Sequence, residues 1–370
     1  MKRTIIDLHV LQTVPPSNIN RDESGSPKTA TYGGVRRARV SSQAWKRATR
    51  VEMARHLDAA KLSKRTVRVV ELVAAAILRR DPQCEDAPQR AEAILAAAGL
   101  KVKKTKTTGD ALPESGYLMF VSAAQADRLA ELALTQEAAG AKADAQAALR
   151  VDHGVDIALF GRMVADDKSL SVDASCQVAH AISVDGVAPE FDYYTAVDDL
   201  NRDDESGAGM IGTVEFNSST LYRYATLDVD ALHETLGDVA ATTEAAGAFV
   251  EAFVRSMPTG KQNTFANRTL PEGVVVMVRE TQPVNLVQAF EEPVVQGDGG
   301  GRLRAACHKL AQEAQDVAAA YGEAPVQSYV VTKGEQASGL GALGEVLTMN
   351  DLGRRVRQLV SERLGGASDE

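Results

Sequence analysis

The chain has few aromatic residues, few cysteines and no long apolar run, and each of these absences excludes a class of protein. Phe, Tyr and Trp make up 5% of the 370 residues, with a single Trp, which argues against a protein that stacks many bases on rings. Cys84, Cys176 and Cys307 stand far apart, which argues against a disulfide framework and against a zinc site. No apolar run approaches the roughly 20 residues that cross a membrane. We therefore expect a cytoplasmic protein with no bound metal, no cofactor and no membrane contact.

Acidic residues are absent from residues 28–50, which read KTATYGGVRRARVSSQAWKRATR and carry seven Lys or Arg. The first 65 residues hold 14 basic and five acidic residues, a net charge of +9. Because the whole chain carries −9, the other 305 residues carry −18. Positive charge gathered in one segment of an acidic chain is typical of a protein that binds a polyanion.

Hydrophobic periodicity and turn residues predict an α+β fold. Strands are predicted at 5–14, where Pro15-Pro16 follows, and at 35–40, 155–163, 213–227 and 274–279. Helices are predicted at 41–59, 65–80, 86–98, 122–149, 239–257, 303–321 and 340–363. Apart from the short strand 35–40 and the helices before residue 150, the order is strand, helix, strand, strand, helix, strand. This is the ferredoxin-like βαββαβ motif, and we predict one composite domain that carries insertions at 61–150 and 186–212.

The predicted helix 41–59 has two distinct faces and a polar start. Its polar face, about 100° wide, carries Gln43, Lys46, Arg47 and Arg50. A separate arc, which can face the sheet, carries Ala44, Ala48 and Val51. Ser41 or Ser42 caps the helix, and its free N–H groups and positive dipole end suit a phosphate. Further bases approach from the preceding strand and loop: Arg36, Arg37, Arg39, Arg21 and Lys28.

Two interpretations of this basic surface are open. A basic helix face is commonly a solvated surface that makes weak salt bridges. Seven bases without a local acid instead favour a ligand held by its phosphates, such as the backbone of a single-stranded nucleic acid.

Seven segments along the chain carry a family resemblance. They are INRD (19–22), YGGVRRARVSSQAWKRATR (32–50), GVDIALFGRM (154–163), VAHAIS (179–184), DYYTAVDDL (192–200), GTVEFNSSTLYRYA (212–225) and PTGKQNTFA (258–266). In this order they resemble the CasC-type backbone subunit of Cascade, the type I-E CRISPR surveillance complex, which belongs to the RAMP superfamily. The resemblance covers nearly the whole chain and is weakest over 60–150 and after 290.

The resemblance implies a hand-shaped protein with three parts. These are an RRM-like palm (1–60, 151–185 and 213–370), helical fingers (61–150) and a β-hairpin thumb (186–212). It implies that several copies line up head to tail along the spacer of one CRISPR RNA. Each thumb displaces one base at regular intervals, and the other bases pair with target DNA in an R-loop. Other Cascade subunits complete this antiviral ribonucleoprotein, and a recruited helicase-nuclease cuts the DNA, so the subunit itself is not an enzyme.

The resemblance also implies roles for individual residues. Contacts with RNA are expected from Arg21, Lys28, Arg37, Ser41, Gln43, Lys46, Arg47, Arg50, Met163 and Lys261, with Met163 against a base. The thumb tip that displaces a base is expected at Tyr193, Tyr194 and Thr195. Beyond the resemblance, one basic loop is either solvated or in contact with target DNA: Lys101, Lys103, Lys104 and Lys106. The acidic run 198–205 is either solvated, repels nucleic acid or meets bases of a neighbouring copy.

The main alternative is a RAMP-type endoribonuclease that cuts bound RNA through Asp22. Related backbone subunits use an aspartate in the loop after the first strand, and Asp22 lies in such a loop. It belongs, however, to the segment that resembles the non-cutting type, and a structural aspartate is the simpler interpretation. His9 and His56 could serve an acid–base ribonuclease, yet the sequence places no partner near either. The motifs of nucleotide-binding enzymes do not occur in the required setting.

Overall fold

The computed structural model describes residues 3–103, 112–195, 211–295 and 301–366, and the chain forms two compact units. Unit 1 comprises residues 1–52, 178–226 and 249–359, and unit 2 comprises residues 53–177, 227–248 and 360–370. Both units contain helices and strands, so the predicted α+β class is confirmed. The predicted boundaries of palm, fingers and thumb remain predictions.

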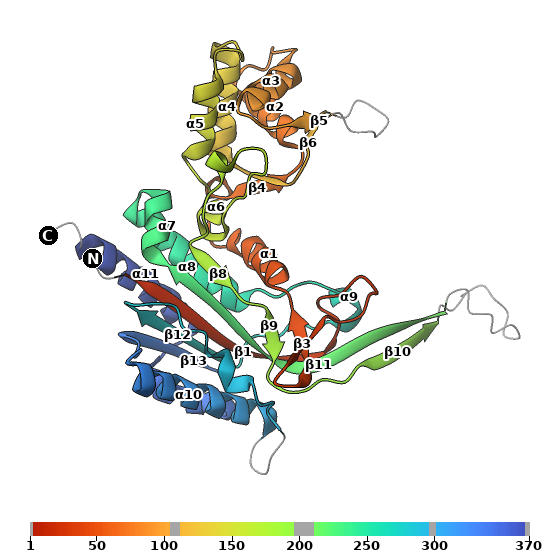
Figure 1. Cartoon of the computed structure of the whole chain (residues 1–370), viewed down its shortest axis with the longest axis vertical. Coiled ribbons are helices and arrows are strands. Elements are labelled where there is room, and N and C mark those ends of the chain that lie inside the picture. The colour runs from red at the N-terminus through yellow and green to blue at the C-terminus, as the bar shows by residue number, and fades with distance from the viewer. Residues whose placement is uncertain (1–2, 104–111, 196–210, 296–300, 367–370) are drawn as a thin grey trace, which may run out of the picture. The chain divides into compact units, whose positions relative to one another are not determined.

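Unit 1 is built on one large mixed sheet (Figure 1). Its strands are β1 (Ile5–Ser17), β2 (Thr29–Tyr32), β3 (Val35–Val40), β9 (Ala181–Ser183), β10 (Glu190–Thr195), β11 (Ile211–Asp228), β12 (Gly273–Arg279), β13 (Gln327–Thr332) and β14 (Glu345–Val346). They run in the order β14-β13-β12-β1-β11-β9-β3-β2, and β10 pairs with β11. β12 is antiparallel to β1 and β13, β9 is antiparallel to β11 and β3, and β14 is parallel to β13.

Helices pack against both faces of this sheet. On one face α10 (Gly301–Tyr321) contributes Cys307 and Leu310 to a core that includes Leu11 and Val275. On the other face α1 (Ser42–Met53) inserts Trp45 among strand residues. The strand β12, GVVVMVR, is buried at every position, which is the pattern of a strand covered on both faces. The remaining helices that lie in or extend through unit 1 are α8 (Val239–Arg255), α9 (Gln262–Phe265), α11 (Met349–Gly365) and the 3₁₀ segments Leu286–Phe290 and Glu335–Leu343.

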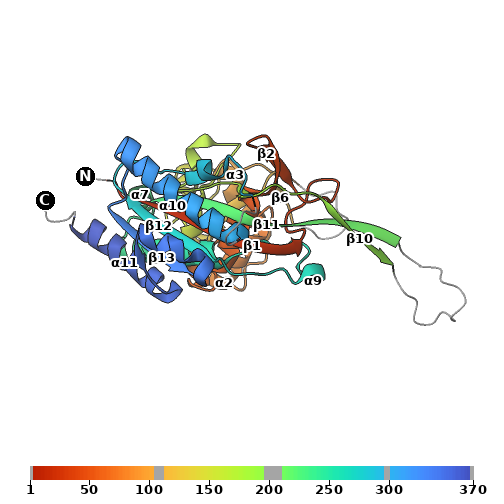
Figure 2. The ribbon, with the colours of Figure 1, turned by 90° about the horizontal axis from the view of Figure 1, so that it is seen from below.

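The hairpin of β10 and β11 extends beyond the rest of the sheet (Figures 1 and 2). The two strands are antiparallel, and their register runs from Glu190 opposite Phe216 to Thr195 opposite Ile211. Every residue of β10 is exposed, whereas the second half of β11 is buried in the sheet. One strand thus continues from the core of unit 1 into a projecting hairpin.

Unit 2 is mainly helical. It contains β4 (Ser63–Thr66), α2 (Val69–Arg80), α3 (Ala87–Ala97), β5 (Val102–Lys103), β6 (Glu114–Ser115), β7 (Met119–Ser122), α4 (Ala123–Thr135), α5 (Lys142–Arg150), α6 (Val155–Phe160), the 3₁₀ segment Lys168–Leu170 and α7 (Val229–Leu236). The core of α2 to α5 combines Val73, Ile77 and Leu129 with many alanines, whose small side chains let the helices approach closely. Ser122 and Gln125 form a capping box that starts α4.

The elements with strong periodicity were predicted correctly: strands 35–40, 213–227 and 274–279, and helices 239–257 and 303–321. The prediction of a strand at 155–163 is wrong, because Val155–Phe160 is the helix α6. The alternating pattern assumed that Asp156 faces water. Asp156 is instead fully buried, and its Oδ1 accepts the Ser63 N–H at 2.8 Å.

Several predicted boundaries also differ. The predicted helix 122–149 is two helices, α4 and α5, and the helix predicted from residue 41 ends at Met53. β1 continues through Pro15-Pro16 to Ser17. The β12 pairing of β1 ends at Leu11, so the missing proline N–H groups remove no bond to that neighbour.

Candidate nucleic-acid interface

Helix α1 begins where three segments of unit 1 meet. The Ser41 Oγ accepts the Ala44 N–H at 3.3 Å, which makes Ser41 the N-cap. The Ser41 N–H donates to Asn20 Oδ1 at 2.8 Å, and the Ser42 N–H donates to His180 Nδ1 at 3.0 Å. The expectation that the helix start offers free N–H groups to a phosphate is therefore wrong for these three groups, because each is bonded within the chain.

The buried face of α1 is set by its largest side chain. Trp45, Thr49 and Met53 are spaced four residues apart and are all buried. The Arg223 guanidinium lies 3.7 Å from the centre of the Trp45 ring, a cation–π contact. The predicted core-facing arc is wrong, since Val51 is 56% exposed. Burying the indole removes far more apolar area from water than burying that arc of small residues would.

The opposite face of α1 carries the predicted polar residues. Gln43 and Arg47 are exposed, and Lys46 and Arg50 are half-buried. Within the described chain, neither Lys46 nor Arg47 forms an ion pair. Two adjacent cations without a carboxylate partner repel each other, and a polyanion laid along this face would relieve that repulsion.

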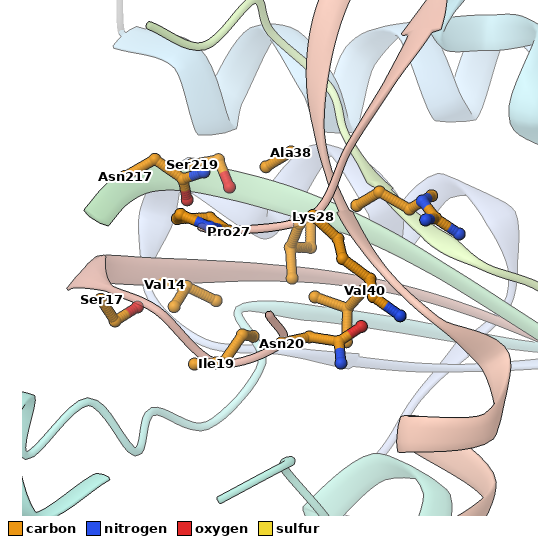
Figure 3. Close-up of a pocket in the computed structure, with 12 residues that line it drawn as sticks. Val14, Ser17, Ile19, Asn20, Pro27, Lys28, Ala38, Val40, Asn217 and Ser219 are labelled. Atoms are coloured by element: carbon orange, nitrogen blue, oxygen red, sulfur yellow. The ribbon is translucent and has the colours of Figure 1, made fainter. Parts of the chain in front are cut away.

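A small hollow with a volume of about 20 Å³ lies next to the start of α1. It is formed by the end of β1, the loop 17–28, β3 and β11, and Figure 3 shows Lys28, Asn20 and Val40 around it. The Lys28 N–H donates to the Asn20 carbonyl at 2.9 Å, and the Arg39 N–H donates to the Lys28 carbonyl at 2.9 Å. Such a hollow holds about one water, so a larger ligand would lie across this surface.

Arg39 and His180 join Lys28 at this surface. The pairing of Val40 with Ala181 brings His180 beside β3, next to the start of α1. Burial lowers the pKa of His180, and the charges of Arg39 and Lys28 lower it further. Neither Arg39 nor His180 was among the predicted contact residues. His180 carries no sequence signal of its own, because only the pairing of β3 with β9 places it there.

Arg37 requires a correction. Its side chain is fully buried, and its guanidinium donates to the carbonyls of Ser183 at 3.0 Å and of Phe290 and Glu291 at 2.9 Å. These three bonds join β3 to two distant segments of unit 1. A buried guanidinium occupied in this way has a structural role, so Arg37 is left out of the interface.

Asp22 closes its own loop. Its Oδ1 accepts the Ser24 N–H at 2.9 Å, the Ser24 hydroxyl at 2.7 Å and the Ser26 N–H at 3.1 Å. The hydrogen bond from the Ser24 hydroxyl, followed by those from backbone N–H groups, lowers the pKa of Asp22. The neighbouring Arg21 is exposed and bridges to Pro27 across the same loop. The loop thus holds Asp22 by the hydrogen bonds of a structural aspartate.

The predicted thumb residues lie on the exposed strand β10. Tyr193 is 64% exposed and Tyr194 is 40% exposed, and they pair with Thr213 and Gly212. The Tyr194 ring covers Gly212 so closely that a Cβ there would lie 2.5 Å from the tyrosine hydroxyl. Thr195 ends the described part of the strand. The hairpin therefore presents aromatic rings outside the core of unit 1.

The remaining predicted residues lie elsewhere. Lys261 has a φ of 51° and precedes α9, and its neighbour Gly260 lies against the Ile19 carbonyl. Met163 belongs to unit 2 and is 82% exposed, although the adjacent Arg162 is buried.

The basic loop of unit 2 is described only in part. Lys101 forms an ion pair with Asp166 at 3.4 Å, and Lys103 is exposed. Lys104, Lys106 and the acidic run 198–205 lie outside the described residues.

The three cysteines are free, and no cluster of metal-ligating side chains is found among the described residues. No helix in the described ranges is long and apolar enough to cross a membrane.

Comparison with known proteins points to one family. The sequence pattern of the CT1975-like proteins matches residues 6–354, whereas no curated protein sequence matches the chain. A solved chain described as "CRISPR RNA-guided surveillance complex, pre-nicking" is 33% identical, with a TM-score of 0.84 over 95% of this chain and 100% of that chain. Another, described as "CRISPR RNA-guided surveillance complex", is 29% identical, with a TM-score of 0.73 over 95% and 99% of the two chains. Because the family match spans most of the sequence, the chain belongs to the family of CT1975-like proteins.

Proposed function

We propose that the chain is a CRISPR RNA-binding backbone subunit of a surveillance complex, of the CasC type found in type I-E Cascade. The observation that carries this proposal is the α1 face, where Lys46 and Arg47 have no ion-pair partner in the described chain. Lys28 and Arg39 add positive charge near the start of the same helix. The solved chains described as parts of RNA-guided complexes support RNA as the polyanion.

The chemistry of this surface suits a guide RNA of any sequence. Lysine and arginine hold phosphates and fix the register of a strand without reading its bases. A subunit that accepts many different spacers needs this kind of contact. The proposed contact set is Arg21, Lys28, Arg39, Ser41, Gln43, Lys46, Arg47, Arg50 and Lys261 in unit 1 and Met163 in unit 2.

The palm and thumb of this proposal rest on unit 1. The strands β12, β1, β11 and β9 are neighbours in that order, and α1 and α8 lie between them in sequence, which supports a ferredoxin-like palm. The projecting β10–β11 hairpin would be the thumb, with Tyr193, Tyr194 and Thr195 displacing a base. Unstacking a base costs a few kcal/mol, and aromatic rings such as these would offset part of it by stacking.

Assembly would follow the RNA. Copies of this chain would join head to tail through unlike surfaces, an arrangement that the length of the RNA limits. Other Cascade subunits would cap the filament, target DNA would pair with the guide, and a recruited helicase-nuclease would cut it. The subunit itself would be non-catalytic, since Asp22 is held by Ser24 and Ser26 within its loop.

The test is RNA recovery from cells. The full chain, co-expressed with a CRISPR RNA and sister subunits, is expected to purify with that RNA. Replacing Lys46 and Arg47 by alanine removes two unpaired charges and is expected to reduce the recovered RNA. It should also flatten the dependence of affinity on salt by about 1.4, or about 0.7 for each phosphate neutralised.

The matched control is Arg304→Ala with Lys309→Ala, which removes two charges from α10 of the same unit, where both are ion-paired. This control is expected to bind RNA like the unchanged chain. Equal RNA recovery and equal salt dependence for both double variants would contradict the proposal. Cleavage of complementary RNA that Asp22→Ala abolishes would instead establish the endoribonuclease.

A further inference from the structure

His180 is fixed by the backbone of α1. A main-chain N–H can only donate, so the 3.0 Å bond from the Ser42 N–H requires an unprotonated, accepting Nδ1 on His180. The proton of the neutral imidazole then lies on Nε2. Because the His180 side chain is exposed, this Nε2–H is a donor at the surface of unit 1.

The surroundings favour the neutral imidazole. Burial lowers the pKa of His180, and Arg39 and Lys28 are the charged groups that lower it further. The positive end of the α1 dipole, which Nδ1 faces, acts in the same direction. Protonation of Nδ1 would also break the bond to Ser42. His180 thus differs from its two basic neighbours, because it offers a hydrogen bond without a charge.

We propose that His180 is an RNA-binding residue that donates its Nε2–H to a backbone phosphate as an uncharged group, between the cations Lys28 and Arg39. This inference rests on the proposed function, and it adds a contact that neither the basic pattern of the sequence nor the exposed cations identify. A donor on a fixed ring restricts where the phosphate can sit. The flexible side chains of lysine and arginine supply charge with less directional control.

Two substitutions separate the two nitrogen atoms of His180. His180→Asn places an amide oxygen near the position of Nδ1, which keeps an acceptor for the Ser42 N–H and removes the distal donor. His180→Gln extends an amide N–H₂ toward the position of Nε2 and keeps that donor. The affinity of the full chain for a fluorescein-labelled single-stranded oligouridine is expected to fall about tenfold in His180→Asn, since hydrogen bonds to charged groups contribute about 1.5 kcal/mol or more. His180→Gln should retain most of the affinity.

The salt dependence distinguishes an uncharged donor from a cation. In His180→Asn the slope of log affinity against log salt is expected to equal that of the unchanged chain. Lys28→Ala is expected to lower the slope by about 0.7, the value for one phosphate contact on a single strand. A comparable drop of the slope in His180→Asn would overturn the proposal. So would an affinity difference between His180→Asn and the unchanged chain that vanishes as the pH rises from 7 to 8.5.

The Lys46→Ala, Arg47→Ala variant separates failure of this inference from failure of the proposed function. If that variant weakens oligouridine binding while His180→Asn and His180→Gln bind like the unchanged chain, the α1 surface holds RNA and the assignment of His180 is wrong. If none of the three variants changes binding, the RNA-binding surface itself is wrong. The exposed position of His180 makes unfolding of these variants unexpected, and their melting temperatures check this.

Discussion

The core of unit 1 and the outer face of α1 both contain basic side chains, but they use them in opposite ways. Arg37, Arg223 and Arg279 are no more than 2% exposed. Their guanidinium groups are occupied by carbonyls, an amide, a carboxylate or aromatic rings. On α1, Lys46 and Arg47 have no acidic partner within the described chain. The core thus satisfies its cations internally, whereas the α1 face leaves cations for a ligand.

This difference teaches what to expect when a basic residue is replaced. A buried cation that loses its partners, or a partner that loses its cation, leaves an uncompensated group in a region of low dielectric constant. An exposed cation leaves only water behind, so its loss affects the ligand and not the fold. Stability and RNA affinity are therefore expected to respond to separate sets of basic residues.

The largest effect is expected at Arg279, whose Nε donates to Asp7 Oδ2 at 2.9 Å. Arg279→Met keeps much of the side-chain volume but leaves the buried Asp7 carboxylate without its cation. Breaking such a pair from one side costs about 3–5 kcal/mol, and urea unfolding at neutral pH measures this. Arg304→Ala, at an exposed ion pair, is the control and is expected to change stability by less than about 0.5 kcal/mol. Equal effects of the two changes would remove the distinction between core and surface cations.

Two neighbouring arginines of β3 give a closer test. Arg37→Met removes donors from three buried carbonyls and is expected to lower the free energy of unfolding by about 2 kcal/mol. The Arg36 side chain is 50% exposed and lies 3.9 Å from the carboxylate of Glu215, so Arg36→Met is expected to cost less than about 0.5 kcal/mol. Urea unfolding of both variants measures the ratio. An Arg36 effect as large as that of Arg37 would contradict the assignment of Arg37 to the core.

The sequence predicted these elements better than the roles of their side chains. The strand 35–40 follows from its flanking glycines and serines, and the strand 274–279 from its run of valines. Arg37 and Arg39 stand on the same face of β3 by alternation, yet one is buried and the other lies at the surface hollow. The carbonyls that bury Arg37 lie 146 to 254 residues away along the chain, so no local pattern reveals them.

The same reason explains the errors at α1 and α6. The polar face of α1 was predictable because it needs only helical spacing. Its core face depends on what Trp45 meets, and that includes Arg223 from a strand far along the sequence. In α6 the pattern treated Asp156 as exposed, whereas a backbone N–H from Ser63 makes its burial favourable. Local periodicity thus fails where a polar side chain finds a distant partner.

A third prediction concerns pH and the core of unit 1. Full burial, assisted by the charge of Arg279, lowers the pKa of His9 to about 3. The unfolded chain, with a histidine pKa near 6.5, therefore binds a proton that the folded chain excludes, and stability falls as the pH drops from about 6.5 toward 3. The loss from His9 is expected to be about 1.4 kcal/mol per pH unit. His9→Phe removes the titrating group, so urea unfolding at pH 6 and pH 5 should show a shallower loss. An unchanged pH dependence would contradict the neutral, buried His9.

The smallest effect on stability is expected on α1, which completes the comparison with the core. The charges of Lys46 and Arg47 have no ion-pair partner among the described residues, so replacing both by alanine breaks no pair and places a better helix former at each site. The free energy of unfolding without RNA should change by less than about 0.5 kcal/mol. With RNA present, however, the unchanged chain should gain stability with ligand concentration and the double variant should gain less, because only binding to the folded state stabilises it. Thermal unfolding with and without oligouridine measures both quantities. A double variant that is destabilised without RNA would show that these side chains support the fold, and the division between core cations and ligand cations would then fail at α1.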